Sequence, residues 1–180
     1  MNIYFVRHGQ TDWNLQKKLQ GLADIPLNDT GKKQAKDLQS QLADKEIDLI
    51  ITSPLQRAVE TANIINEKNN LPIMKAEGLH ERDFGEFEGL IKGEWYRDFW
   101  NWNKNLRYEK AENVQDFSKR INDELDNIIT KYKGKNILIV AHGGVGIPTA
   151  IKFGSKEISE NGDLLEFVFP HGEIEKFIID

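Results

Sequence analysis

Short apolar runs alternate along the chain with segments in which apolar residues recur every three or four positions. The runs are rich in β-branched residues, which predicts buried strands at 3–6, 48–52, 72–76 and 136–140. The periodic segments predict helices at 31–43, 54–67 and 114–132, with a further helix opening after Ala141. Strands that alternate with helices indicate a layered α/β fold with a mostly parallel central sheet.

Residues typical of element ends refine these boundaries. Thr30 is a plausible N-cap of the first helix, while Ser53 would cap the second with Pro54 at its first position. Residues 15–28 have no clean period and are expected to form a loop. The tail alternates on both sides of Pro170-His171-Gly172, which suggests a closing hairpin.

Composition narrows the class of protein. A length of 180 residues fits one domain, 1–180, and the net charge of -5 with mixed signs argues against a general nucleic-acid binder. The absence of cysteine excludes disulfides and thiolate chemistry. No apolar run reaches membrane-spanning length and no signal peptide is recognised, so no membrane partner is expected and the cytoplasm is the default location. The oligomeric state is not predicted.

Charged and polar residues directly follow the apolar runs that predict buried strands. Arg7-His8-Gly9 follows the first strand and His142-Gly143-Gly144 the last; Arg57 lies in the first turn after the second strand, and His80-Glu81-Arg82 comes one loop after the third. Each of these residues alone could have a purely structural role. The histidine could be hydrogen-bonded at the edge of the sheet, the arginine could form a salt bridge, and the glutamate could be exposed in a loop. Together they would converge on one edge of the sheet, where open α/β sheets bind ligands.

This combination is suited to a phosphoryl group. The guanidinium donors of arginine match the geometry of phosphate oxygens. The backbone N–H groups of Gly143 and Gly144, at the start of a predicted helix, would also bind an anion. A neutral histidine can attack phosphorus, a protonated second histidine can stabilise the charge, and a carboxylic acid can protonate the leaving group. Histidine-x-histidine and HExxH patterns are absent, so no metal site is expected. No Walker or dinucleotide fingerprint is present either, so no cofactor is expected.

Five blocks occur in an order that resembles the histidine phosphatase superfamily, the phosphoglycerate mutase-like proteins. They are VRHGQTDWN, GLADIPLNDTGKKQA, TSPLQRAVETA, LHERDFGEFEG and VAHGG. The resemblance implies a three-layer α/β/α sandwich in which His8 is phosphorylated and Glu81 is the general acid and base. It implies that Arg7, Arg57 and His142 bind the phosphoryl group, with hydrogen bonds from Asn14 and the Gly143 backbone.

The resemblance leaves three activities open. LHERDFG followed by Lys92 is similar to the mutase branch, in which an arginine and a lysine help to hold the substrate carboxylate, which makes Arg82 and Lys92 candidates. Phe84 replaces the tyrosine usual there, and the chain is short, so a metal-independent phosphatase acting on a small phosphorylated metabolite is favoured over a mutase. A non-catalytic phospholigand-binding module is the third alternative.

The segment 88–112 is aromatic and basic and lies where the family usually has a small cap. Trp95, Trp100 and Trp102 would anchor this cap or stack on a substrate ring. Its basic residues, Lys92, Arg97 and Arg107, are candidates for selecting the rest of the substrate.

Overall fold

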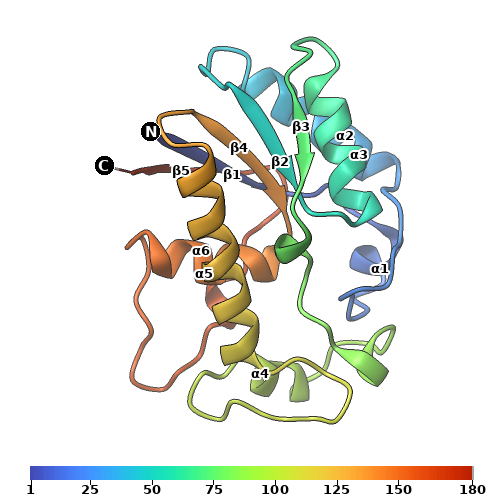
Figure 1. Cartoon of the computed structure of the whole chain (residues 1–180). Helices are drawn as coiled ribbons and strands as arrows, with labels where there is room; N and C mark the ends of the chain where they lie inside the picture. Colours follow the sequence, from blue (N-terminus) through green and yellow to red (C-terminus); the bar gives the residue numbers. More distant parts are fainter. Residues whose placement is uncertain (180) are drawn as a thin grey trace.

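A single five-stranded sheet forms the centre of the computed structural model, which describes residues 1–179 (Figure 1). Its strands are β1 (Asn2–Arg7), β2 (Leu49–Thr52), β3 (Ile73–Lys75), β4 (Ile137–Ala141) and β5 (Ile174–Ile178). They lie in the order β3-β2-β4-β1-β5, and all neighbours are parallel except β5, which is antiparallel to β1. The predicted mostly parallel sheet is confirmed.

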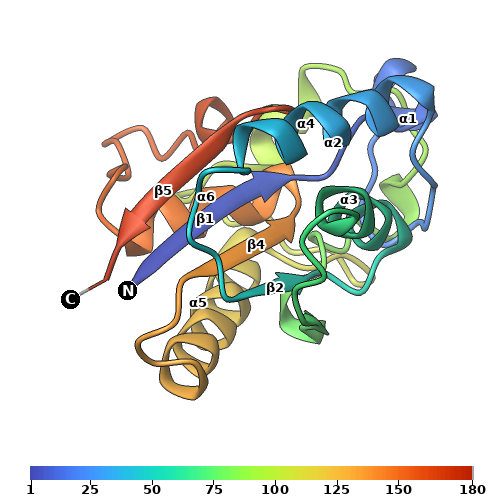
Figure 2. The same ribbon diagram turned by 90° about the horizontal axis from the view of Figure 1, so that it is seen from above.

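Helices cover both faces of the sheet. The longer ones are α2 (Asp29–Gln41), α3 (Gln56–Asn66), α5 (Val114–Lys131) and α6 (Gly143–Lys152), and the short ones are α1 (Asp12–Leu15) and α4 (Trp95–Phe99). Figure 2 shows α2 and α5 on opposite sides of the strands, and α3 packs beside α2 as α6 packs beside α5. The expected three-layer α/β/α sandwich is thus confirmed. No helix within residues 1–179 is both long and apolar enough to cross a membrane.

Two hydrophobic cores follow from the alternation of side chains along the strands. Tyr4 and Val6 of β1 belong to the core under α2 and α3, whereas Ile3 and Phe5 belong to the core under α5 and α6. Each central strand is therefore apolar at successive positions, because both of its faces are covered.

Two helices begin at positions other than those predicted. Asn28, not Thr30, caps α2, and its side chain accepts a hydrogen bond from the Gly31 N–H at 2.9 Å. Both residues are good N-caps, so only the path of the preceding loop decides between them. The helix α3 begins at Gln56, beyond Pro54, and has no side-chain cap at its N-cap position. The Gln56 N–H donates instead to Asp24 in the loop 15–28.

The predicted closing hairpin in the tail is wrong. The stretch before the turn contains a short 3₁₀ helix, Leu165–Phe167, and the stretch after it becomes β5. Because β5 pairs along the free edge of β1, Phe177 is buried in the core rather than against the preceding tail residues. Gly172, with φ of 78°, makes the turn between the two stretches.

The segment 88–112 packs around the end of α5 and the loop before β5. Trp100 is buried, and its ring lies 5.8 Å from that of Phe117 on α5. The Trp100 carbonyl and the Trp102 N–H also bond to the backbone at Leu164 and Gly162. Trp100 therefore has the anchoring role that the sequence allowed for some of these tryptophans.

Candidate active site

The residues that follow β1, β2 and β4 are His8, Ser53 and His142, and the parallel register of these strands places them side by side. The His8 N–H donates to the Ala141 carbonyl at 2.9 Å, and the Ser53 N–H donates to the Val140 carbonyl at 3.0 Å. The two imidazole rings lie 5.1 Å apart, centroid to centroid. The structure thus brings the two histidines together, as their strand-end positions predict.

The His8 ring is held with one nitrogen engaged and the other available. Its Nδ1 lies 2.7 Å from the Gly9 carbonyl, to which it donates, so the lone pair is on Nε2. The Arg57 Nε donates to this Nε2 at 3.2 Å. Burial, followed by the charge of Arg57, holds the pKa of His8 well below the usual 6.5. His8 is therefore neutral at neutral pH, with its lone pair on Nε2.

His142 is held by Ser53, the residue that the sequence predicts as the cap of the second helix. Its Nε2 lies 2.6 Å from the Ser53 Oγ, so Ser53 orients this ring rather than capping a helix. Its Nδ1 is buried and has no partner among residues 1–179. Burial, then Arg57 and Arg7, holds the pKa of His142 well below 6.5. The ring is therefore neutral rather than protonated as the sequence suggests, and a neutral ring can donate to an anion through an Nδ1–H.

Two guanidiniums share the site without carboxylate partners. The Arg57 side chain is fully buried, and its Nη1 and Nη2 donate to the Ala23 and Gly21 carbonyls at 2.9 and 2.7 Å. Arg7 donates from Nη1 to the Phe169 carbonyl, and its Nε is buried without a partner in the described part of the chain. Burial lowers the pKa of Arg57 to about 10, so the side chain remains charged at neutral pH. No ion pair within residues 1–179 involves either arginine, which favours an anion as the missing partner.

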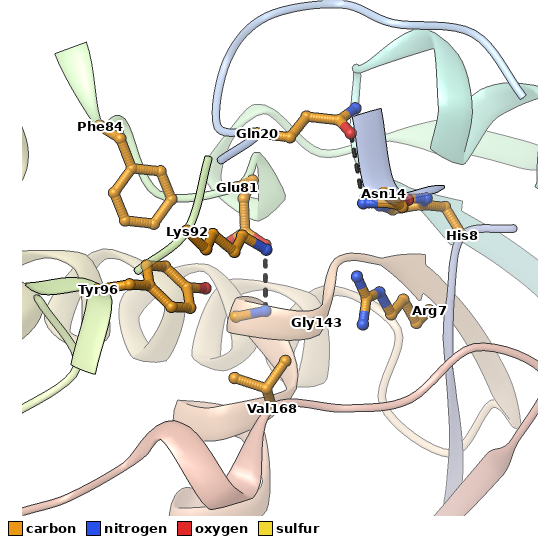
Figure 3. Close-up of a pocket in the computed structure, with 11 residues that line it drawn as sticks. Arg7, His8, Asn14, Gln20, Glu81, Phe84, Lys92, Tyr96, Gly143 and Val168 are labelled. Carbon is orange, nitrogen blue, oxygen red and sulfur yellow. Dashed lines mark hydrogen bonds between the residues drawn. The ribbon is translucent and has the colours of Figure 1, made fainter. Parts of the chain in front are cut away.

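Glu81 lines the cavity together with Arg7, His8 and Gly143 (Figure 3). Its Oε1 accepts from the Arg82 N–H at 2.9 Å, and its Oε2 accepts from the Gly144 N–H at 3.1 Å. Only 8% of the residue is exposed. Two backbone donors therefore fix the carboxyl group opposite Arg7 and His8, within the same cavity as the Gly143 backbone.

Asn14 borders the cavity from the short helix α1. Its Oδ1 accepts from the Thr11 N–H at 3.1 Å while the Thr11 Oγ1 accepts from the Asn14 N–H, a capping box that holds the amide in place. The neighbouring Gln20 amide is oriented so that its Nε2 donates to the Thr11 Oγ1 at 2.7 Å, and its Oε1 accepts from the Arg57 Nη1 and Nε at 3.1 and 3.2 Å. Gln20 is buried and also lines the cavity, which has a volume of about 30 Å³.

The family follows from comparison with known proteins. The sequence profile described as "Histidine phosphatase superfamily (branch 1)" matches residues 3–149, which include every strand-end residue described above. The chain belongs to the histidine phosphatase superfamily. It is accordingly an enzyme of phosphoryl transfer.

Relatives in this superfamily have several names. The chain is 40% identical over 158 residues to "Uncharacterized phosphatase PhoE" of Bacillus subtilis (strain 168), covering 87% of this chain and 80% of the relative. The solved structure "Bacillus stearothermophilus YhfR" matches with a TM-score of 0.89 at 27% identity, over 99% of this chain and 91% of that one. A phosphoserine phosphatase from Entamoeba histolytica, solved with 3-phosphoglyceric acid, matches with a TM-score of 0.82 at 26% identity, over 98% and 90%. One relative, "Phosphoglycerate mutase-like protein 4" of Arabidopsis thaliana, is 35% identical over 153 residues, covering 79% of this chain and 66% of that protein.

Among the candidates for substrate selection in this member of the superfamily, only Lys92 lines the cavity. Its Nζ lies 4.8 Å from the centre of the Tyr96 ring, and burial, then Arg7, lowers its pKa. Arg97 and Arg107 are exposed and form ion pairs with Asp163 and Asp116. Their guanidiniums are thus occupied on the surface rather than in the site.

Arg82 lies in an aromatic cage instead of the cavity. Its guanidinium carbon is 5.3 to 5.4 Å from three aromatic rings, those of Phe84, Phe99 and Trp100. Its nitrogens donate to the carbonyls of Phe99 and Glu112. We therefore no longer expect Arg82 to contact substrate, because the fully buried guanidinium joins the segment 88–112 to the backbone of Glu81.

Several residues of the site were not found from the sequence. Gln20 and Val168 line the cavity, and Ser53 orients His142. His171 lies behind His8, with ring centroids 5.6 Å apart. Only His171 gave a signal, as one of four histidines and as the one between a proline and a glycine in the tail.

Proposed function

We propose that this protein hydrolyses the phosphomonoester of a small metabolite without a metal ion, through a phosphohistidine intermediate on His8. The observation that carries this proposal is the lone pair on His8 Nε2. The bond from Nδ1 to Gly9 leaves that nitrogen unprotonated at the cavity, beside the charged Arg57. A neutral histidine in contact with a guanidinium is suited to attack a dianion that the guanidinium also binds.

Buried donors that lack a hydrogen-bond partner in the described chain indicate how the substrate would bind. A phosphoryl dianion would accept from the Nε of Arg7, from Arg57 and from the Nδ1 of His142, two of which have buried donors without partners in residues 1–179. The Gly143 N–H at the start of α6 and the Asn14 amide add neutral donors. As the dianion takes the Arg57 Nε, the His8 Nε2 lone pair becomes free.

Transfer then needs two steps. His8 Nε2 attacks phosphorus, the bond from phosphorus to the leaving oxygen breaks, and Glu81 in its acid form gives that oxygen a proton. In the second step Glu81 takes a proton from water, the water oxygen attacks phosphorus, and the bond to His8 breaks. Phosphate leaves and both side chains return to their starting protonation states.

The buried guanidiniums make a metal ion unnecessary in this scheme. Magnesium neutralises the transferring phosphoryl group in many other enzymes, and here Arg7 and Arg57 supply fixed positive charge at the same place. No three His, Asp or Glu side chains within residues 1–179 are grouped as metal ligands would be.

Phosphoglycerate mutase activity is the second candidate, and two observations favour it. Relatives with mutase-like names match, and Lys92 reaches the cavity. The withdrawal of Arg82 into its aromatic cage leaves one cation rather than two beyond the phosphoryl site, which favours hydrolysis over the mutase reaction.

The partner we propose is a small phosphorylated molecule, as in the relatives solved with such ligands. For location we keep the cytoplasm as a proposal, which fractionation of the source cells would test.

Three assays test the proposed function. His8→Ala should abolish phosphate release from p-nitrophenyl phosphate, and EDTA should leave the unmodified enzyme fully active. Loss of activity in EDTA would exclude the metal-independent scheme. Incubation with 3-phosphoglycerate, with and without a bisphosphate primer, separates the two candidates: isomerisation without net phosphate release would favour the mutase.

A further inference from the structure

The tail segment 168–172 forms one wall of the active site. Val168 lines the cavity, and the Phe169 carbonyl accepts from Arg7 Nη1 at 2.9 Å. The Phe169 N–H donates to the Gly143 carbonyl at 3.0 Å. This segment therefore touches a phosphate-binding arginine and the first residue of α6 at once.

His171 extends these contacts to the residue proposed as nucleophile. Its Nδ1 donates to the His8 carbonyl at 2.6 Å, while the His8 N–H donates to Ala141 on the other side. Both backbone polar groups of His8 are thus fixed at the point where β1 ends. The two rings also meet edge to face, with an interplanar angle of 68°.

We propose that His171 is a positioning residue that holds His8 in the geometry needed for attack on phosphorus. This role rests on the proposed function, because it matters only if His8 is the nucleophile. β1 ends at Arg7, so the backbone beyond His8 is no longer paired in the sheet. A donor to the His8 carbonyl therefore limits rotation of the peptide that joins His8 to Gly9. A displacement of about 1 Å at a reacting atom can reduce turnover by about a hundredfold.

The charges around His171 suit this role. The groups that face it are Arg7 and His8 at the end of β1 and Lys92 from the segment 88–112. Burial and then Arg7 lower the pKa of His171 to about 4, against the opposing effect of its bond to the His8 carbonyl. The imidazole is therefore neutral at neutral pH and donates a hydrogen bond without placing a positive charge beside the nucleophile.

The test compares three substitutions at one position. In His171→Asn the side-chain amide nitrogen lies the same number of bonds from the backbone as Nδ1, so the bond to His8 can be kept. In His171→Gln the donor lies one bond further out, and in His171→Leu there is none. Glu173→Gln, an exposed neighbour, is the control. Steady-state kinetics with p-nitrophenyl phosphate and thermal unfolding are measured for each variant.

We expect kcat to fall about tenfold in the leucine and glutamine variants with KM within about twofold, and the asparagine variant to recover to within about threefold. Should the leucine variant fail to fold, the asparagine and glutamine pair gives the same comparison. Equal kcat across the three variants, or a rise in KM alone, would overturn the positioning role. If His8→Ala is inactive while the His171 series is flat, only this role fails. If His8→Ala stays active, the proposed function fails and the positioning role with it.

Discussion

Glu88 holds the loop that in turn holds Arg57. Its Oε1 accepts from the Leu22 N–H at 2.8 Å and its Oε2 from the Ala23 N–H at 2.7 Å. The carbonyls of the same loop, at Gly21 and Ala23, accept both terminal nitrogens of Arg57. A carboxylate that accepts from the N–H groups of the loop therefore fixes the carbonyls that hold the guanidinium beside His8.

The substitution Glu88→Gln should disturb Arg57 without removing it. An amide keeps one acceptor for the loop but turns an NH₂ group toward the second N–H, so one charge-assisted bond is lost. Such bonds contribute about 1.5–3 kcal/mol, and Glu88 is only partly buried, so the lower end applies. A loss of about 1.5 kcal/mol in transition-state stabilisation corresponds to about a tenfold fall in kcat/KM.

Kinetics with p-nitrophenyl phosphate measure this loss, and the inhibition constant for inorganic phosphate measures it independently. We expect kcat/KM and the affinity for inorganic phosphate to fall together, because phosphate would bind the same guanidinium. Glu86→Gln is a matched control, because Glu86 lies two residues away and is exposed. The reasoning is refuted if Glu88→Gln changes kcat/KM by less than about twofold, or if the control loses as much activity.

Four other predictions test separate parts of the molecule. Glu81→Gln should slow alkyl phosphates far more than p-nitrophenyl phosphate, because an aryl leaving group needs no proton; equal losses would remove Glu81 from the proton-donor role. The pKa of His8 lies well below 6.5, so protonation of His8 should not lower kcat/KM as the pH falls through 6.5, and an acid limb at that pH would contradict a buried neutral nucleophile. Because His8 and His142 stay neutral in the folded protein where the unfolded chain takes up protons, the free energy of unfolding should fall as the pH drops below 6.5; urea unfolding that showed no such fall would disprove this. Arg82→Met should lower the free energy of unfolding by about 2–4 kcal/mol, because two buried carbonyls lose their donor, and an unchanged melting temperature would disagree.

Much of the site could be predicted because it depends on strand ends. The carboxyl ends of parallel strands meet at one edge, so Arg7, His8 and His142 had to lie together once the apolar runs were identified as strands. The alternation of strands and helices was sufficient to predict the layered α/β architecture. These features follow from local patterns of burial, which the sequence records directly.

Other features depend on choices between similar energies. Asn28 and Thr30 both cap helices well, and the loop path selects one of them. The tail could pair with itself or with the open edge of β1, and this choice brought His171 behind His8. Arg82 and Lys92 lie in irregular segments without a period, so no pattern reveals that one guanidinium turns into a cage while one ammonium faces the cavity.

Trapping the phosphoenzyme addresses the role of His8 itself. The enzyme is mixed with p-nitrophenyl phosphate, quenched in alkali, where phosphohistidine is stable, and digested for peptide mass spectrometry. We expect one added phosphoryl group on the peptide that contains His8, lost on acid treatment and absent from His8→Ala. A protein that turns over substrate while this peptide stays unmodified, or that carries the phosphoryl group on another side chain, would contradict attack by His8.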